Sequence, residues 1–270
     1  MYALDPAMPV LLRPDGAVQV GWDPRRAVLV RPPEGLSVSA LVAVLRALAT
    51  PMSRAEVTRR AGPGFGAVLD ALLGAGVLRC VVPVGGQAMS IRVHGCGPLA
   101  ALLLDGLRCS GARVSQTGHA NAAAGSGVDL VVLADWLAPD PRLLRELNVA
   151  RVAHLPVRVR DGVGLIGPVV LPGVTSCLMC ADLHRTQRDP AWPALSAQLR
   201  GVIGCADRPT MLATAALALG QLQRIIAGVR GGGGDPPAFD TTWEVDAGAG
   251  TIRARRWPRH PLCGCWPAHG

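Results

Sequence analysis

The sequence contains no lysine, so all 27 of its basic residues are arginine. The absence of lysine excludes a Walker-type phosphate lysine, Schiff-base chemistry and anchoring of pyridoxal phosphate. The arginines outnumber the 19 acidic residues and give a net charge of +8. This charge favours acidic partners, such as an anionic peptide, a nucleotide or a nucleic acid. A soluble protein from an arginine-rich proteome would show the same balance.

Aromatic residues make up only 3% of the 270 residues, although 50% of the chain is hydrophobic. A core must therefore consist mostly of Ala, Val and Leu, and the length suits one large or two small domains. The N-terminus lacks the basic head and apolar run of a signal peptide. The longest apolar run, residues 211–220, is interrupted by Gln221 and is too short to span a bilayer. We expect a cytoplasmic protein without a membrane segment, whose eight cysteines do not form a disulfide framework.

The first 84 residues carry the pattern of a small mixed domain. Residues 10–31 consist of short β-rich runs separated by turn residues. Three helices are predicted after them, over residues 37–49, 53–61 and 63–76. The second begins with Ser53 and Glu56, which fit a capping box, and a strand or wing follows the third in "VLRCVVPV". This order predicts a winged helix-turn-helix domain over residues 1–84, with residues 85–87 as a linker.

Strands and helices alternate over residues 88–270. The predicted strands are residues 90–95, 112–116, 128–135 and 151–159, and the predicted helices are residues 97–109 and 139–148. Asp161 and Gly162 have the composition of a hairpin turn. A long apolar helix over residues 209–229 and a hairpin over residues 238–257 follow. The alternation predicts an α/β fold with a doubly wound, mostly parallel sheet.

Two close cysteine pairs lie 83 residues apart in the chain, Cys177 with Cys180 and Cys263 with Cys265. Zinc prefers four soft ligands in a tetrahedron, commonly supplied as two close pairs from separate loops. Four such ligands leave no open position, so the sequence predicts one structural zinc ion. The alternatives are four cysteines without a metal, a redox dithiol at Cys177 and Cys180, or His260 as a replacement ligand.

Gly95 and Gly97 follow a predicted strand and open a predicted helix, as in a loop that holds a dinucleotide or ATP phosphates. Ala100 occupies the place of a third glycine. The second strand ends in Ser115, Gln116 and Thr117 and offers no acidic residue for a ribose hydroxyl. The pattern fits a working nucleotide loop or one that has lost this function.

The blocks "HLPVRV", "IGPVVLPGVTSCLMCADLHRTQRDPAWPAL", "GVIG" and "HPLCGC" resemble the ThiF-like branch of ubiquitin-activating-type adenylating enzymes. The similarity is closest to cyclodehydratase-associated proteins that accompany YcaO-type enzymes in making thiazole- or oxazole-modified peptides (TOMMs). The blocks "DGAVQVGWDPRRAVLV" and "VLDALLGAGVL" resemble the winged-helix peptide-recognition element of ribosomal-peptide biosynthesis. The chain is thereby similar to the TOMM precursor leader peptide-binding proteins.

This resemblance implies a ThiF-like Rossmann-type domain over residues 88–270, with a zinc knuckle formed by the two cysteine pairs, in a homodimer. Active adenylating members bind ATP through a glycine loop, arginines, a lysine and aspartates. The chain keeps Gly95, Gly97 and Asp135 but has no lysine and a shortened loop, which puts adenylation in doubt. Members paired with YcaO-type enzymes bind the leader of a precursor peptide and present it to the partner.

An extended leader can add as a strand to an exposed sheet edge and dock its apolar side chains against a helix. The candidate edge is Ala27, Val28, Leu29 and Val30, and the candidate helix face is Val68, Leu69, Leu72 and Leu73. Arg25, Arg26 and Arg31 flank the edge and would attract an acidic leader. The same leucines would also suit a core-facing helix.

Three functions are compatible with these patterns. They are a non-catalytic leader-binding scaffold for a YcaO-type cyclodehydratase, an ATP-dependent adenylyltransferase acting on a peptide or protein carboxylate, and a winged-helix DNA-binding regulator. The helix predicted over residues 63–76 contains one aspartate and no arginine, unlike a helix that reads bases. Nucleic acid is therefore not the expected partner, and the sequence favours the scaffold.

Overall fold

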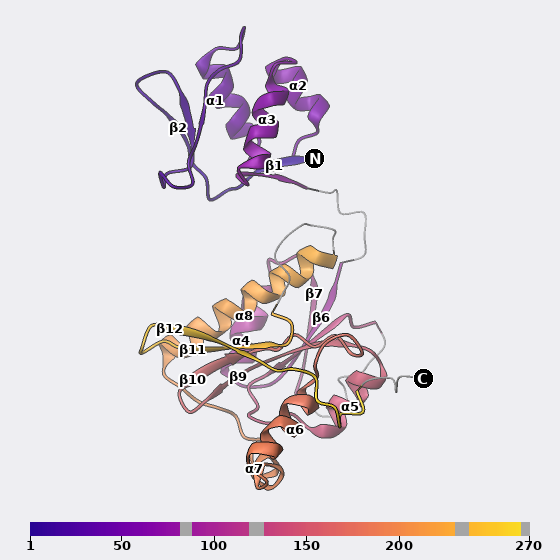
Figure 1. Cartoon of the computed structure of the whole chain (residues 1–270). Helices are drawn as coiled ribbons and strands as arrows, with labels where there is room; N and C mark the ends of the chain where they lie inside the picture. The colour runs from indigo at the N-terminus through magenta and orange to yellow at the C-terminus, as the bar shows by residue number, and fades with distance from the viewer. Residues whose placement is uncertain (82–87, 119–126, 230–237, 266–270) are drawn as a thin grey trace. The chain divides into compact units, whose positions relative to one another are not determined.

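The computed structural model describes residues 1–81, 88–118, 127–229 and 238–265. These residues form two compact units, the first within residues 1–81 and the second within residues 88–265 (Figure 1). The linker predicted at residues 85–87 lies outside the described residues.

The first unit contains three short helices and two small antiparallel sheets. Its elements are β1 (Tyr2–Leu4), β2 (Val10–Leu12), β3 (Val18–Val20), β4 (Val28–Val30), α1 (Val38–Ala47), α2 (Arg54–Ala61), α3 (Phe65–Gly74) and β5 (Leu78–Cys80). Strands β2, β3 and β4 form one sheet in that order, so β4 is an outer strand. Strand β5 pairs with β1, which the sequence pattern did not reveal.

Serine hydroxyls begin the first two helices of this unit. Ser37 accepts a hydrogen bond from the Ala40 amide at 3.2 Å, and Ser53 accepts one from the Glu56 amide at 3.1 Å. The predicted capping box is thus half formed, because the Glu56 carboxylate accepts from the Arg60 and Arg59 guanidinium groups instead. The helices bury a shared apolar core whose largest fully buried side chains are Leu41, Leu45, Leu48, Phe65, Leu69 and Leu72.

The second unit alternates strands and helices as predicted. Its elements are β6 (Ser90–His94), α4 (Pro98–Leu107), β7 (Arg113–Thr117), β8 (Leu130–Ala134), α5 (Pro141–Val149), β9 (Ala153–Arg160), β10 (Val163–Ile166), α6 (Leu178–Arg188), α7 (Trp192–Gln198), α8 (Arg208–Val229), β11 (Thr241–Asp246) and β12 (Thr251–Arg256). Helices α6 and α7 were not predicted.

The strands of the second unit form one sheet in the order β12-β11-β10-β9-β8-β6-β7. Strands β7, β6, β8 and β9 are parallel, and β10 to β12 add antiparallel strands. Asp161 and Gly162 both adopt positive φ in the turn between β9 and β10, as their composition predicted. The α/β class is confirmed, and the chain reverses its winding direction between β6 and β8.

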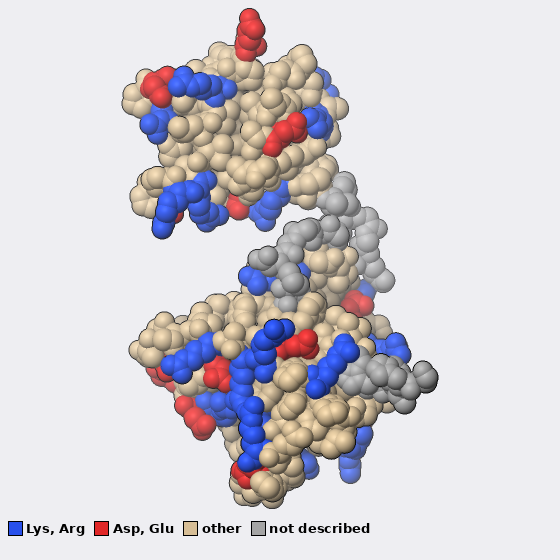
Figure 2. Space-filling view, viewed as in Figure 1, with Lys and Arg blue, Asp and Glu red and all other residues tan. Residues whose placement is uncertain are grey.

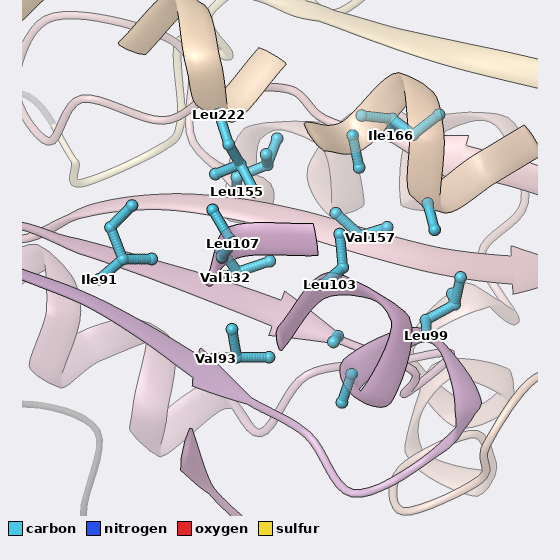
Figure 3. Close-up of a cluster of buried hydrophobic side chains, with 14 of the residues drawn as sticks. Ile91, Val93, Leu99, Leu103, Leu107, Val132, Leu155, Val157, Ile166 and Leu222 are labelled. Carbon is cyan, nitrogen blue, oxygen red and sulfur yellow. The ribbon is translucent and has the colours of Figure 1, made fainter. Parts of the chain in front are cut away.

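Two helical layers cover this sheet (Figure 1). Alternate residues of β8 point to opposite faces, so that Val132 joins α4 and α8 in one core while Val131 joins α5 and α6 in another. Figure 3 shows the first core, in which Leu99, Leu103 and Leu107 of α4 meet side chains of the central strands.

Helix α8 corrects one expectation. It runs unbroken for 22 residues, well beyond the run of residues 211–220, and by length and composition alone it could cross a membrane. One third of its most apolar window is buried in this unit. Met211, Ala218 and Leu222 of that helix belong to the core that it shares with α4.

Candidate functional site

The carboxylate of Asp135 occupies the N-terminus of α4. Its oxygen atoms accept hydrogen bonds from the backbone amides of Gly97 at 2.8 Å, Leu99 at 2.9 Å and Ala100 at 3.3 Å. These are amides of the first turn, which have no partner within the helix. Asp135 follows β8 directly, is 1% exposed and has a positive φ of 75°. The backbone turn therefore directs the acid into the position where a phosphate would be held.

This carboxylate approaches both glycines of the loop, and at Gly95 the Ala134 carbonyl oxygen would also lie only 2.9 Å from a Cβ atom. A Cβ atom at Gly95 would lie 2.8 Å from Asp135 Oδ2, and one at Gly97 would lie 2.7 Å from Asp135 Oδ1. Any larger residue would therefore collide with the acid. Burial raises the pKa of Asp135, while the three backbone hydrogen bonds act in the opposite direction. The glycine pattern is explained by an internal anion without a nucleotide.

The structure brings the four predicted cysteines together. Cys177 is the N-cap of α6 and Cys180 lies in the first turn, while Cys263 and Cys265 come from the segment after β12. All four sulfur atoms lie within 4.8 Å of one another. The Sγ–Sγ distances are 3.7 Å from Cys177 to Cys180, 3.6 Å from Cys177 to Cys263 and 3.6 Å from Cys180 to Cys265.

These distances fit a tetrahedral metal site. With metal–sulfur bonds of about 2.3 Å, the edge of a tetrahedron is about 3.8 Å, close to the observed separations. Without a metal, the hydrogen bond that Cys177 donates to Cys180 raises the pKa of Cys177, as does burial, and the same hydrogen bond lowers the pKa of Cys180. A cation at the centre would stabilise all four thiolates. The cluster can hold a metal ion, and its donor set suits zinc.

Two histidines border the cysteine cluster. His184 Nε2 lies 2.9 Å from the Pro258 carbonyl oxygen, and its ring packs edge-on against His260 at 4.7 Å. The Leu262 amide donates to His260 Nδ1 at 3.2 Å. His260 is not among the residues whose ligand atoms converge, so the four cysteines form the donor set. The remaining four cysteines, at positions 80, 96, 109 and 205, are free and exposed.

The predicted peptide-docking residues divide into exposed and buried ones. Leu29 of β4 is 58% exposed, and Val28 and Ala27 are partly buried. Leu69 and Leu72 of α3 are 1% and 0% exposed and lie in the core, so their side chains do not reach the surface.

Two of the three remaining docking residues are partly accessible. Val68 and Leu73 of α3 are partly buried at the edge of the core, whereas Val30 is buried within it. The start of α3 lies near the end of β4, since a Cβ atom at Gly64 would be 3.5 Å from the Pro33 side chain.

The second unit thus belongs to the class of doubly wound α/β proteins, and it carries a cluster of four cysteines that could hold a metal ion. Known structures share this fold. The heterocyclase TruD matches with a TM-score of 0.66 at 16% sequence identity, covering 98% of this chain and 42% of TruD. A heterocyclase in complex with substrate and cofactor matches with a TM-score of 0.66 at 15% identity, covering 98% and 39%.

MccB from E. coli with ATP matches with a TM-score of 0.59 at 14% identity, covering 98% of this chain and 99% of MccB. The chain therefore spans about two fifths of the heterocyclases and nearly the full length of MccB. No family model matches the sequence, and no curated protein matches it. These comparisons establish the shared fold over both units.

Proposed function

We propose that this chain binds the leader of a ribosomally made precursor peptide and presents it to a YcaO-type cyclodehydratase that forms azoles or azolines. In this proposal residues 1–84 are a winged-helix recognition element and residues 88–270 a ThiF-like domain. The protein is a cytoplasmic homodimer and does not itself adenylate. The outer strand β4 is the observation that carries the proposal.

Strand β4 pairs on one side with β3, and within the described residues no strand pairs with its other side. An extended peptide can hydrogen-bond to such an edge as an added strand. Leu29 offers an exposed apolar side chain on this strand. Val68 and Leu73 of α3 are the remaining candidates for contact with the apolar side chains of the leader.

Charge at this edge suits an acidic leader. Arg26 and Arg31, on either side of β4, are exposed. Arg25 is paired with Asp23 at 3.2 Å, so it contributes less free positive charge. Exposed charges of this kind accelerate association with an oppositely charged peptide more than they add to its affinity.

The hydrogen bonds of the glycine loop favour a peptide-binding scaffold and argue against an adenylyltransferase. The amides of Gly97, Leu99 and Ala100 already donate to Asp135, so a nucleotide phosphate would have to displace a buried anion from the helix terminus. The absence of lysine removes a second phosphate contact. We assign the cysteine cluster a structural zinc ion, which would fasten the segment after β12 to the start of α6.

The test uses synthetic peptides that correspond to the N-terminal regions of short open reading frames encoded beside this gene. Fluorescence anisotropy measures their affinity for the full chain, for Leu29→Asp and for the control Leu12→Asp. Leu12 is 64% exposed on β2, the opposite outer strand of the same sheet. We expect one peptide to bind and Leu29→Asp to weaken it at least tenfold, with Leu12→Asp close to the native protein. Equal affinities for the two variants would contradict docking at β4.

A further inference from the structure

A cavity of about 260 Å³ lies in the second unit, on the face of the sheet covered by α5 and α6. Leu144 and Leu178 in its wall belong to the core on that face, which is opposite the face on which α4 packs. Its other walls come from β9, α7 and the segment that includes Trp257. The volume is slightly below the range of about 300–1,000 Å³ that is common for small-molecule sites.

Four arginines line this cavity, namely Arg158 and Arg160 of β9, Arg185 of α6, and Arg200 after α7. Asp182 is the only acidic residue of the lining, and it is already engaged. Its Oδ1 accepts from Arg185 at 2.8 Å and from the Trp192 indole at 3.1 Å. Figure 2 shows that basic side chains gather over β11, β12 and the region of α6 and α7 on the visible face of this unit.

Three of these guanidinium groups have a distant carboxylate partner or none among the described residues. Among the described residues, the guanidinium groups of Arg158 and Arg200 donate no hydrogen bond and form no ion pair, although Arg158 is partly buried. The acidic oxygens nearest to Arg160 are on Asp161 at 3.6 Å and Glu244 at 4.0 Å. Burial and the charge of Arg185 lower the pKa of Arg158 to about 10, while the charge of Asp182 acts in the opposite direction, so Arg158 remains charged at neutral pH. Arg158 is therefore a partly buried charge whose nearest carboxylate, Asp182, is already paired with Arg185, and a ligand that supplies negative charge would stabilise it.

Aromatic rings hold one of the arginines in place. The guanidinium carbon of Arg185 lies 5.1 Å from the centre of the Trp192 ring and 4.5 Å from that of Trp257. Cation–π contacts and the ion pair with Asp182 therefore fix Arg185 before any ligand arrives. Trp192 and Trp257 also line the cavity and give a ligand an apolar surface beside the charges.

We propose that this cavity binds a small phosphate-bearing molecule, whose phosphate contacts Arg158, Arg160 and Arg200 while a small apolar part lies against the tryptophans. Guanidinium groups match phosphate oxygens in pairs of hydrogen bonds. A phosphate carries about two negative charges at neutral pH and offsets several arginines, whereas a carboxylate carries one. The site is independent of the leader-binding role, and its failure would leave peptide docking at β4 untouched.

The test is calorimetric titration of the full chain with sodium pyrophosphate at constant ionic strength, with a triglutamate peptide as the second probe. We expect saturable binding of pyrophosphate that weakens at least tenfold in Arg158→Gln. The control Arg108→Gln removes the same charge from the exposed end of α4 and should change the affinity less than twofold. Circular dichroism checks folding, and Arg200→Gln at the exposed rim should weaken binding about fivefold if Arg158→Gln does not fold.

Two results would overturn the proposal. One is the absence of saturable pyrophosphate binding, or equal weakening by Arg158→Gln and Arg108→Gln, which would mean only diffuse attraction to a basic protein. The other is triglutamate binding more tightly than pyrophosphate and depending on Arg158, which would assign the cavity to an acidic peptide side chain.

Discussion

Replacing Asp135 with alanine tests how the glycine loop is held. The native carboxylate satisfies the amides of Gly97, Leu99 and Ala100, and Leu99 and Ala100 are fully buried. Alanine would leave all three amides without their partner. The helix terminus would then have to be satisfied by water entering the vacated space.

The size of the effect follows from these three donors. An unsatisfied buried donor costs about 1–3 kcal/mol, and the lower value applies where water can enter. Three donors therefore give about 3 kcal/mol. The raised pKa of Asp135 shows that burying its charge opposes this gain. We expect a net loss of about 2–3 kcal/mol, which corresponds to about 5–10 °C in Tm for a unit of this size.

Urea denaturation and thermal melting of the full chain provide the assay. The control is Asp105→Ala on the same helix, where the carboxylate is exposed and pairs with Arg108 at 2.8 Å; this change should stay within about 0.5 kcal/mol. Equal stability of Asp135→Ala and the native protein would refute the role assigned to this carboxylate.

The loss of stability in Asp135→Ala should change with pH in a direction that the pKa of Asp135 determines. Because the pKa of Asp135 in the folded protein is above its ordinary value of 3.8, the linked stabilisation is fully present below 3.8 and is lost as pH rises through the folded pKa. The penalty of Asp135→Ala should therefore be larger near pH 4 than at pH 7. A penalty that shrinks on acidification would contradict this sign.

Two further predictions concern the second unit. Metal analysis should find one zinc ion per chain. Cys180→Ser should lose the zinc and lower Tm by at least about 10 °C. The control Cys109→Ser, at an exposed site, should retain the zinc. A metal-free native protein, or full zinc retention by Cys180→Ser, would contradict this. Burial lowers the pKa of His154 to about 4, so the native protein should lose about 3 kcal/mol as pH falls from 6.5 to 4, measured by urea denaturation at each pH. His154→Leu should flatten this dependence, and an unchanged slope would show that other groups cause it.

Local patterns predicted most of the elements because each rests on neighbouring residues. Serine caps at positions 37 and 53, the Asp161-Gly162 turn and the alternation of strands and helices all appear in the structure. Strand β1 was missed because its partner β5 lies more than 70 residues away in sequence. Helices α6 and α7 were missed because the cysteine pair and the prolines of that segment suggested a loop.

In the candidate site, the sequence predicted the cysteine cluster because the spacing within each cysteine pair already places two sulfur atoms close together. Two close cysteine pairs require only that their segments meet, and they do. The glycine loop could not be interpreted in the same way, since Asp135 lies 38 residues beyond Gly97 and reaches it through a positive-φ turn. Likewise, apolar spacing on α3 does not separate core from surface, and Leu69 and Leu72 face the core.

In the function proposed above, this chain binds a leader peptide and does not activate ATP. The most direct test is exchange of labelled pyrophosphate into ATP by the chain with magnesium and the peptide selected by the anisotropy assay, with and without a YcaO-type partner. We expect no exchange by the chain alone, and ATP consumption only when the partner is present. Peptide-dependent exchange by the chain alone would contradict it and would establish adenylation of a carboxylate.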